Sequence, residues 1–463
     1  MELLVYNQYI SSLDNNVTVL PIMPIQLTNT TVTYLDHLNE YCLLEIFSCK
    51  SLTLMDLCSI AETCTRFKQI TQRVCPKEFA IKWWLPPKKW RNLPQKYEFK
   101  SKNYQHLYTL QEIERIVKNF GAHLSELKIH DQLDVVRWVA EHCGNSTLKC
   151  LKFEIDGVCI HMNWIFHWLP SLGRLTLKDC ELLKDVSSPD LNFDSLIELK
   201  IDSSSGCVTL LKHTFPNLER FTWSRSYMYT SDSNNNCDVL YKFIRRHGNL
   251  KGIAVSDYSV SSIGLFHVID SSCKELVELS IGYLMSSKLW FDFTTLGIVA
   301  KLKTLDLNLG FEKYCPYMQL LQALQSVQTI KIWCISNAVV SRQIFDILSK
   351  LRNLRELYLS SCVLNWIPWE ILTQLRKVCL PYFVDRDNLL NIIRHLINLE
   401  EIECQFDWSE SEIVYYLSEE YFLEIVKIVE QRKHVLTIKS RCNFVFDKNC
   451  DKNRKVKLIK LNQ

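Results

Sequence analysis

The sequence predicts an α/β protein in which a short three-helix unit precedes a curved solenoid of about twelve strand–helix repeats. Two observations support this fold class. An apolar string of the form L-x-x-L-x-L, with Ile, Val or Phe allowed, recurs twelve times between residues 124 and 404, at intervals of 21–32 residues. Before this array, the stretch Leu35–Ile70 is densely apolar and its spacing fits three short helices.

Composition places the chain among globular proteins. Of its 463 residues, 47% are hydrophobic and 23% are charged, and the net charge is only +3. This balance does not favour a nucleic-acid or membrane partner, and we expect neither. There is no signal-peptide pattern at the N-terminus and no run of eighteen apolar residues. The nineteen cysteines include no CxxC pair, so we expect reduced thiols in an intracellular protein of the cytoplasm, the nucleus or both.

Composition and periodicity divide the chain into five segments. We expect a flexible leader at 1–30, the helical unit at 31–75, a Trp- and Pro-rich connector at 76–110, the repeat array at 111–440 and a basic C-terminal tail at 441–463. The connector is expected to be irregular, with its Trp residues packing the helical unit against the array and its prolines stiffening the join.

The helical unit has recognisable helix starts. Asn39 is a good N-cap for a first helix, because its side-chain oxygen can accept a bond from an amide of the first turn. Thr53 and Asp56 form a capping-box pattern for a second helix, and a third is expected over Thr65–Val74. Domains near forty residues generally need a staple or a partner, and the segment shows no staple. A partner protein is therefore expected to cover it.

The apolar and acidic positions of this segment resemble the F-box family. The resemblance is carried by the strings Leu38-x-x-x-Cys42-Leu43-Leu44-Glu45-Ile46-Phe47 and Leu54-x-Asp56-Leu57-x-x-Ile60-Ala61-x-x-Cys64-x-x-Phe67. Where the family usually has Pro after the first Leu, this chain has Asn39. The resemblance implies docking on the Skp-type adaptor of an SCF ubiquitin ligase, and through it on a cullin and a RING subunit.

Carried over by position, the adaptor contacts implied by the resemblance are Leu35, Leu38, Asn39, Leu43, Leu44, Ile46, Phe47, Leu54 and Leu57. The alternative is that several of these side chains form the internal core of the three-helix unit. Leu57 and Ile60 are the strongest candidates for that role.

The period of the array is that of leucine-rich repeats. The strings begin at Leu124, Leu148, Leu172, Leu196, Leu218, Leu250, Leu276, Leu302, Val327, Leu354, Leu375 and Leu399. Helix-compatible stretches lie between them, at Gln111–Asn119, Asp134–Cys143, Asp238–His247, Ile263–Lys274, Met318–Gln325, Arg342–Leu351 and Asp387–Leu396. Strand followed by helix predicts a horseshoe with its strands on the concave side.

The residues between the leucines are expected to point out of the concave sheet, because strand side chains alternate. In the later repeats these positions include Trp333 and Tyr358 on adjacent strands, flanked by Lys331 and Glu356. Large, rigid aromatics beside charged groups are typical of protein-binding anchors, so we predict that these four residues bind a client protein. The alternative is that one or both aromatics pack against a neighbouring loop.

The most specific function predicted is that of a substrate receptor in an SCF-type ubiquitin ligase, with the array holding a protein client for ubiquitination. No phosphate-binding GxxxxGK, GxSxG or HExxH motif is present, so we expect no catalytic residue, cofactor or metal, and a non-catalytic subunit. The alternative is a leucine-rich-repeat interaction scaffold with no role in ubiquitin transfer.

Overall fold

The computed structural model describes eighteen stretches of the chain. They are residues 35–49, 51–84, 96–100, 105–130, 133–143, 147–154, 159–168, 170–183, 193–225, 233–285, 293–308, 317–333, 338–360, 367–380, 386–404, 419–430, 432–440 and 455–460. The predicted flexible leader at 1–30 lies outside these residues, as does most of the predicted basic tail.

The first described segment is a helical unit, residues 35–74. It contains η1 (Leu35–His37), α2 (Glu40–Phe47), α3 (Leu54–Ala61) and α4 (Thr65–Val74). The Asn39 side chain accepts a hydrogen bond from the Cys42 amide at 2.9 Å, and Thr53 and Asp56 form a reciprocal capping box. The two predicted helix starts are therefore confirmed, because side-chain oxygens satisfy amides that a first turn leaves unpaired.

Each of the twelve predicted repeat strings contains a strand. These are β4 (Glu126–His130), β5 (Cys150–Glu154), β7 (Arg174–Lys178), β9 (Glu198–Asp202), β10 (Arg220–Ser224), β11 (Gly252–Ser261), β12 (Glu278–Met285), β13 (Thr304–Asn308), β14 (Thr329–Trp333), β15 (Glu356–Ser360), β16 (Lys377–Leu380) and β17 (Glu401–Cys404). Each pairs in parallel with the next, with register shifts after Val255 in the pairing of β11 with β12. The result is a long parallel sheet consistent with a leucine-rich-repeat solenoid.

The sheet extends beyond the predicted array at both ends. β1 (Glu78–Trp84) pairs in parallel with β4 and antiparallel with β2 (Lys96–Lys100), which pairs with β3 (Gln105–Tyr108). At the other end, β18 (Leu436–Ser440) and β19 (Val456–Lys460) continue the parallel pairing after β17. Within the described residues this makes one sheet of 17 strands.

The irregular course expected for residues 76–110 is therefore wrong in part. Phe79 and Ile81 of β1 are buried, as an alternating strand requires, but the nearby Trp and Pro residues obscured this short pattern. In the predicted tail, Val456 of β19 is buried in the same way, while residues 441–454 lie outside the described part.

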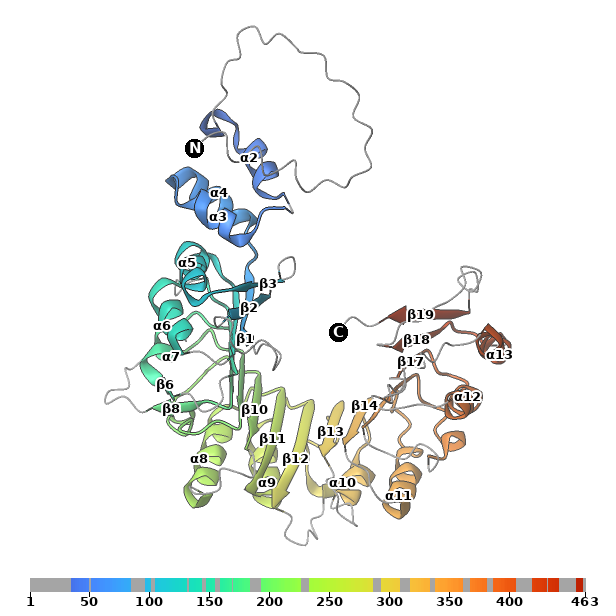
Figure 1. Cartoon of the computed structure of the whole chain (residues 1–463). Helices are drawn as coiled ribbons and strands as arrows, with labels where there is room; N and C mark the ends of the chain where they lie inside the picture. Colours follow the sequence, from blue (N-terminus) through green and yellow to red (C-terminus); the bar gives the residue numbers. More distant parts are fainter. Residues whose placement is uncertain are drawn as a thin grey trace, which may run out of the picture.

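Helices cover the convex side of the sheet (Figure 1). They are α5 (Leu110–Phe120), α6 (Leu133–His142), α7 (Met162–Trp168), α8 (Ser233–Arg246), α9 (Ser262–Ser272), α10 (Met318–Ala323), α11 (Ala338–Leu348), α12 (Arg386–His395) and α13 (Glu419–Val429). Short 3-10 turns occur at η3 (Gly121–His123), η4 (Leu210–Lys212), η6 (Phe293–Thr295) and η8 (Trp369–Ile371), and a small second sheet joins β6 (Cys159–His161) to β8 (Glu181–Leu183). Every stretch predicted to be helical contains a helix.

Asparagines before the first leucine of a repeat connect successive repeats. The side-chain amides of Asn217, Asn353 and Asn398 each donate to a main-chain carbonyl of the preceding repeat, at 2.7–2.8 Å. The accepting carbonyls belong to Asp194, Gln325 and Thr373, which lie 23–28 residues earlier. One repeat period therefore separates donor from acceptor, and these bonds satisfy loop carbonyls at the repeat boundary.

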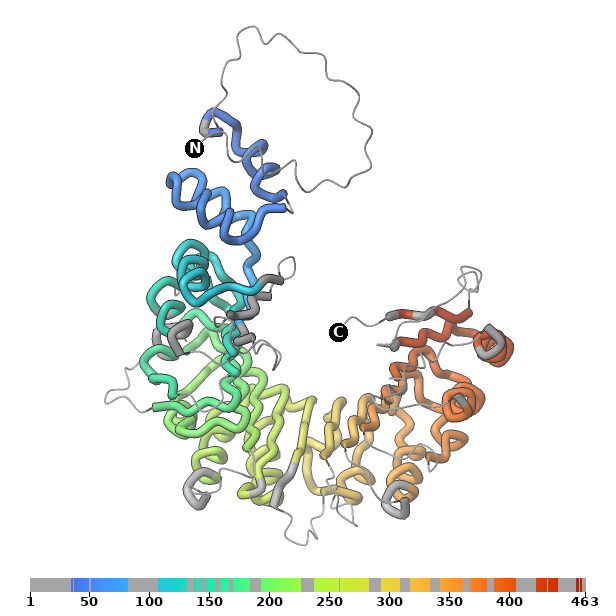
Figure 2. The backbone as a smooth tube through the Cα atoms, in the orientation of Figure 1, coloured from blue at the N-terminus to red at the C-terminus, as the bar shows by residue number. Residues whose placement is uncertain are grey.

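The backbone follows an arc, and the helical unit extends from one end of it (Figure 2). α3 packs against α5, the first helix of the array. Leu43 and Phe47 belong to the same continuous hydrophobic core that runs through the leucines of the repeats. In the described part of the chain, the helices of the array lie on the outer side of this arc (Figure 1).

Candidate functional site

The helical unit exposes three large apolar side chains within twelve residues. Leu35 is 50% exposed, Tyr41 73% and Ile46 41%, and the half-buried Leu38 and Leu44 lie between them in sequence. Asn39 is exposed, with its side chain engaged in the N-cap of α2. Among the described residues, nine large hydrophobic side chains are classed as exposed, and a third of them lie in this short segment. Exposed large apolar side chains so close together in sequence make this segment a candidate interaction site.

Four of the predicted adaptor residues have almost no exposed surface. Leu43, Leu54 and Leu57 are fully buried, and Phe47 packs edge-on against Phe67 with its ring centroid 5.4 Å away. These side chains form the core of the helical unit, because they lie on the faces by which α2, α3 and α4 pack together. The internal-core alternative therefore describes Leu57, whereas Ile60 is only half-buried. A partner can contact the exposed residues without further rearrangement of the unit.

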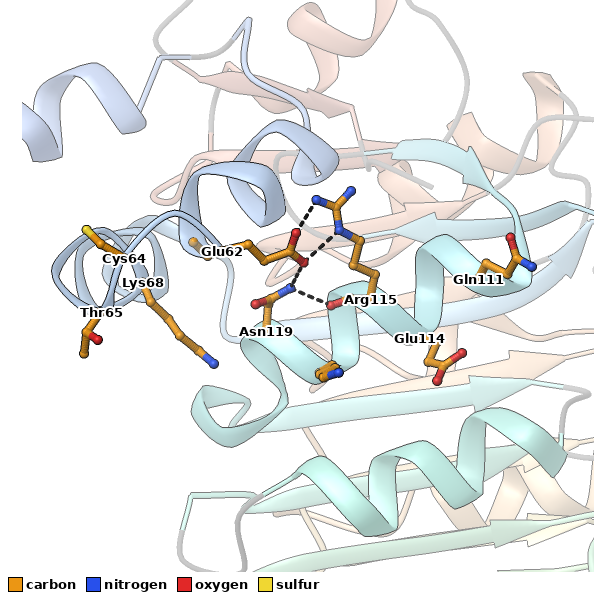
Figure 3. Close-up of a pocket in the computed structure, with 10 residues that line it drawn as sticks. Glu62, Cys64, Thr65, Lys68, Gln111, Glu114, Arg115 and Asn119 are labelled. Carbon is orange, nitrogen blue, oxygen red and sulfur yellow. Dashed lines mark hydrogen bonds and ion pairs between the residues drawn. The ribbon is translucent and has the colours of Figure 1, made fainter. Parts of the chain in front are cut away.

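A polar cluster joins the helical unit to the first repeat (Figure 3). Glu62, just after α3, accepts a 2.8 Å hydrogen bond from Nε of Arg115 on α5 and forms an ion pair with its Nη2. The Asn119 side-chain amide donates to the same carboxylate at 2.8 Å, and Gln72 of α4 donates to the Asn119 carbonyl at 3.0 Å. The hydrogen bond from Arg115 is the main cause that lowers the pKa of Glu62. The cluster therefore fixes α3 and α4 against α5.

This cluster borders a hollow of about 680 Å³ between the two parts of the molecule. Its lining is mostly polar and charged, and consists of Ala61, Glu62, Cys64, Thr65, Lys68, Gln111, Glu114, Arg115, Lys118 and Asn119. Both signs of charge are interspersed around it, so the lining shows no preference for an anion or a cation.

The four residues predicted to bind a client lie on the concave face, but they form two separate groups. The first group surrounds Tyr358. Lys331 Nζ lies 5.3 Å from the centre of its ring, and Lys377 Nζ lies 5.6 Å from it. The phenol donates to Glu356 at 3.3 Å. Tyr358 is therefore held between two cations, and burial is the main cause that raises its pKa.

Lys377 continues this group toward the C-terminal strands. Its ammonium lies 2.7 Å from a carboxylate oxygen of Glu401, which also pairs with Lys439 at 2.6 Å. Burial opposes the charged form of Lys377, but the hydrogen bonds to Glu401 and Tyr358 prevail and raise its pKa. These side chains are partly buried and mutually paired, so this part of the face is an ionic network.

Trp333 forms the second group together with a residue that the sequence interpretation missed. Its indole is 43% exposed, and its Nε1 donates a 2.6 Å hydrogen bond to Oδ1 of Asp306 on β13. Burial is the main cause that raises the pKa of Asp306, while the bond from Trp333 and the nearby Lys331 lower it. Asp306 occupies the outward position between Leu305 and Leu307, so the alternation rule that identified Trp333 also points to it.

Between β10 and β14 the concave face is hollowed, and we call this space the central hollow. It has a volume of about 200 Å³ and is lined by Thr222, Trp223, Ser224, Ala254, Val255, Ser256, Ser280, Ile281, Gly282, Asp306, Asn308 and Trp333. An adjoining lobe of about 160 Å³ shares Thr222, Ala254, Ser280 and Asp306 with it. Small outward-facing side chains on three neighbouring strands create the depression.

Two glycines contribute to the depression because they place no side chain on this part of the concave face. A Cβ at Gly282 would lie 2.1 Å from the Ser256 hydroxyl, so the position has no room for a side chain. At Gly252, the missing side chain lets Arg220 of β10 reach across β11 to Glu278 of β12, with a 3.0 Å hydrogen bond from Nη2. That ion pair forms one wall of the adjoining lobe.

The described residues contain no group of three or more His, Cys, Asp or Glu side chains placed to hold a metal ion. The cysteines among them are free thiols, and burial raises the pKa of several of them, that of Cys58 to about 12. Among the helices that the structure describes, none has the length and apolar composition needed to cross a bilayer.

Comparison with known proteins finds only a distant structural similarity. No protein-family model matches the chain, and no curated protein matches it either. Among solved structures, the crystal structure of a TLR13–ssRNA13 complex aligns with 76% of this chain at 14% sequence identity and a TM-score of 0.29. The chain covers 59% of the length of that protein. The fold assignment here rests on the parallel sheet and its repeat spacing.

Proposed function

We propose that the chain is the substrate-recognition subunit of an SCF-type ubiquitin ligase. In this role, the helical unit docks on a Skp-type adaptor as an F-box does, and the concave face of the array binds a protein client. The chain itself performs no chemistry; it increases the local concentration of the client beside the conjugating enzyme, which is the catalytic contribution of proximity.

The exposed apolar segment of the helical unit carries this proposal. α2, which carries the exposed Tyr41 and Ile46, lies at the end of the molecule farthest from the array (Figure 1), and the buried residues of the unit pack internally. Exposed apolar side chains are costly to hydrate, so covering them with a partner protein is favourable. The F-box resemblance of the same residues supplies the identity of the proposed partner.

The join between the two parts supports a receptor role. Glu62, Arg115 and Asn119 connect α3 to α5 through several hydrogen bonds, and the hydrophobic core is continuous across the join. A helical unit fixed in this way holds the concave face at a constant distance and angle from a docked adaptor. Fixed geometry is what a receptor needs to present a client repeatedly to the same enzyme.

The test uses the full-length chain and a purified Skp-type adaptor. The double variant Leu35→Glu/Ile46→Glu places charges on the exposed segment without touching buried residues. The matched control is Ile397→Glu, which alters an apolar side chain on the array that is 63% exposed. We expect the adaptor to be retained by the natural chain and by the control, and retention to fall at least tenfold for the double variant.

A second candidate function is favoured by the burial of Leu54 and Leu57. These side chains belong to the core shared with α5, as expected if the helical unit caps the first repeat of an interaction scaffold. In that case the natural chain does not retain the adaptor, and charges at Leu35 and Ile46 change nothing. The same measurement therefore separates the two functions.

A further inference from the structure

The central hollow combines a small-residue floor, an aromatic wall and a carboxylate. Ala254, Ser280 and Gly282 contribute little side-chain volume to the floor. Trp333 stands at one edge with almost half of its surface exposed. An exposed indole beside a depression presents both a flat face and space for a group to lie against it.

The charge of the hollow is unbalanced. Among the residues that line it, Asp306 is the only one with a formal charge. Within the described part of the chain, its carboxylate forms one hydrogen bond, from the Trp333 indole. A carboxylate has acceptor capacity for several donors, so Asp306 retains capacity toward the hollow.

The nearest cations each have a partner other than Asp306. Lys331, the neighbour of Asp306 across the strands, lies over the Tyr358 ring at 5.3 Å. Arg220, in the adjoining lobe, is paired with Glu278 through two of its nitrogens, at 3.0 and 3.3 Å. Burial raises the pKa of Asp306 by more than the bond from Trp333 and the nearby Lys331 lower it.

We propose that the central hollow binds an arginine or lysine side chain from an extended segment of a partner protein. In this arrangement the cation pairs with Asp306, and its aliphatic stem or guanidinium plane lies against the indole of Trp333. This combines a charge-assisted hydrogen bond with a cation–π contact, and both are strengthened by partial burial. The inference rests on the proposed function, because the partner is the client held by the array.

The shape of the site indicates a polypeptide segment. The adjoining lobe meets the hollow at Asp306 and Thr222, so the depression continues past the position of the bound cation. Besides Asp306, the charged residues that line the lobe are Glu198, Lys331 and the Arg220–Glu278 pair, which offer hydrogen bonds to a passing main chain. A free amine would fill only one of the two spaces.

The experiment selects twelve-residue random peptides displayed on phage against the full-length chain. We expect the enriched sequences to share an Arg or Lys at one position. A synthetic peptide from this set is then compared with its Arg→Gln version by fluorescence polarisation. On the natural chain we expect the exchange to weaken binding at least tenfold, whereas on Asp306→Asn it has less than a threefold effect. Effects on binding that do not add in this way show that the Arg side chain of the peptide contacts Asp306 directly.

Two further variants keep the result interpretable. Glu403→Gln changes an outward-facing acid in the same row of the concave face but outside the hollow, and it should leave peptide binding within twofold. Ala254→Leu fills the floor without changing any charge, and it should abolish binding. Free arginine amide, the competitor without a peptide extension, should displace the peptide only at concentrations at least a hundredfold higher.

The proposal is overturned if selection yields no peptide, if the enriched peptides share no basic residue, or if Asp306→Asn and Glu403→Gln behave alike. Equal competition by free arginine amide would assign the site to a small cation. Adaptor retention is measured on the same preparations and does not involve the hollow, so failure of the basic side-chain site and failure of adaptor docking are distinguished.

Discussion

The indole of Trp333 donates a 2.6 Å hydrogen bond to the carboxylate of Asp306 on the neighbouring strand. This bond connects two outward-facing positions that are diagonal to each other in the sheet, since Trp333 is opposite Asn308 in the register. It orients a 43% exposed ring before any partner arrives. A preorganised aromatic side chain loses less conformational entropy on binding, which makes Trp333 an effective anchor.

Asp306→Asn should preserve or raise stability. Burial raises the pKa of Asp306 in the folded chain, so the folded state disfavours its charge and stability declines as pH rises through that pKa. The amide removes this cost and still accepts the bond from Trp333. We expect the free energy of unfolding at pH 7 to be unchanged or higher by up to about 1 kcal/mol, measured by urea denaturation.

A decrease of more than about 1 kcal/mol in the same measurement would contradict this account. It would show that the charge of Asp306 stabilises the fold. Trp333→Phe, which keeps a ring but loses the indole donor, is the companion variant because it removes the bond from the other side.

Leu43→Ala should destabilise the helical unit, whereas Ile46→Ala, on the same helix, should leave its stability nearly unchanged. Leu43 is fully buried and Ile46 is 41% exposed, although they are three residues apart on α2. Removal of a buried leucine side chain typically costs about 2–5 kcal/mol, whereas exposed positions usually change by less than ~0.5 kcal/mol. Amide hydrogen exchange across α2–α4 measures the effect locally. Equal acceleration by both variants would show that α2 does not pack as described.

Arg115→Met should loosen the join without unfolding the array. It removes the ion pair and hydrogen bonds to Glu62, which are partly exposed and worth roughly 0.5–1 kcal/mol. We expect faster amide exchange in α3 and α4 and unchanged exchange in the strands from β9 onward. Lys118→Met, on the same helix and at the same hollow, is the control. Unaltered exchange in Arg115→Met would assign the join to hydrophobic packing alone.

Acid should destabilise the array through His247. This buried ring accepts from the Phe215 amide at 2.9 Å through Nε2, and its Nδ1 lies 2.7 Å from the Phe243 carbonyl. Burial lowers the pKa of His247 below its ordinary value of about 6.5, so the unfolded chain binds more protons than the folded chain below that pH. The stabilisation is complete above about pH 6.5 and decreases as the pH falls toward the folded pKa.

The check is the urea midpoint measured between pH 7.5 and 5. It should fall with pH, and the slope should be smaller in His247→Gln, which keeps a neutral acceptor. Part of the pH dependence of the urea midpoint should remain in His247→Gln, because burial also lowers the pKa of His213. Identical slopes for variant and natural chain would exclude His247 as a source of the pH dependence.

The repeat strands could be predicted from sequence because the alternation of apolar and outward residues is visible within each string. Leu305 and Leu307 alternate with outward positions, and the same alternation recurs with nearly constant spacing in every repeat. The caps at Asn39 and Thr53 were also local, since each involves residues only three apart. Such short-range signals do not depend on how the elements pack.

The features that escaped prediction depend on tertiary packing. Leu43 and Ile46 look alike in sequence, and only the direction from which α4 packs decides which is buried. β1 is seven residues long and borders a Trp- and Pro-rich segment, so its alternation was too brief to identify. The Trp333–Asp306 bond requires two strands, a register and a side-chain rotamer. The alternation rule marks Asp306 as an outward residue, but the sequence analysis did not single it out, and nothing in the sequence identifies it as the partner of Trp333.

The most direct test of the central claim is an amide hydrogen-exchange footprint of the full-length chain with and without a purified Skp-type adaptor. The account predicts a stable complex in which protection is concentrated in residues 35–47, around Leu35, Tyr41 and Ile46, while the concave strands β10–β14 exchange as in the free chain. Absence of a complex, or protection located on the concave strands instead of the helical unit, would contradict it.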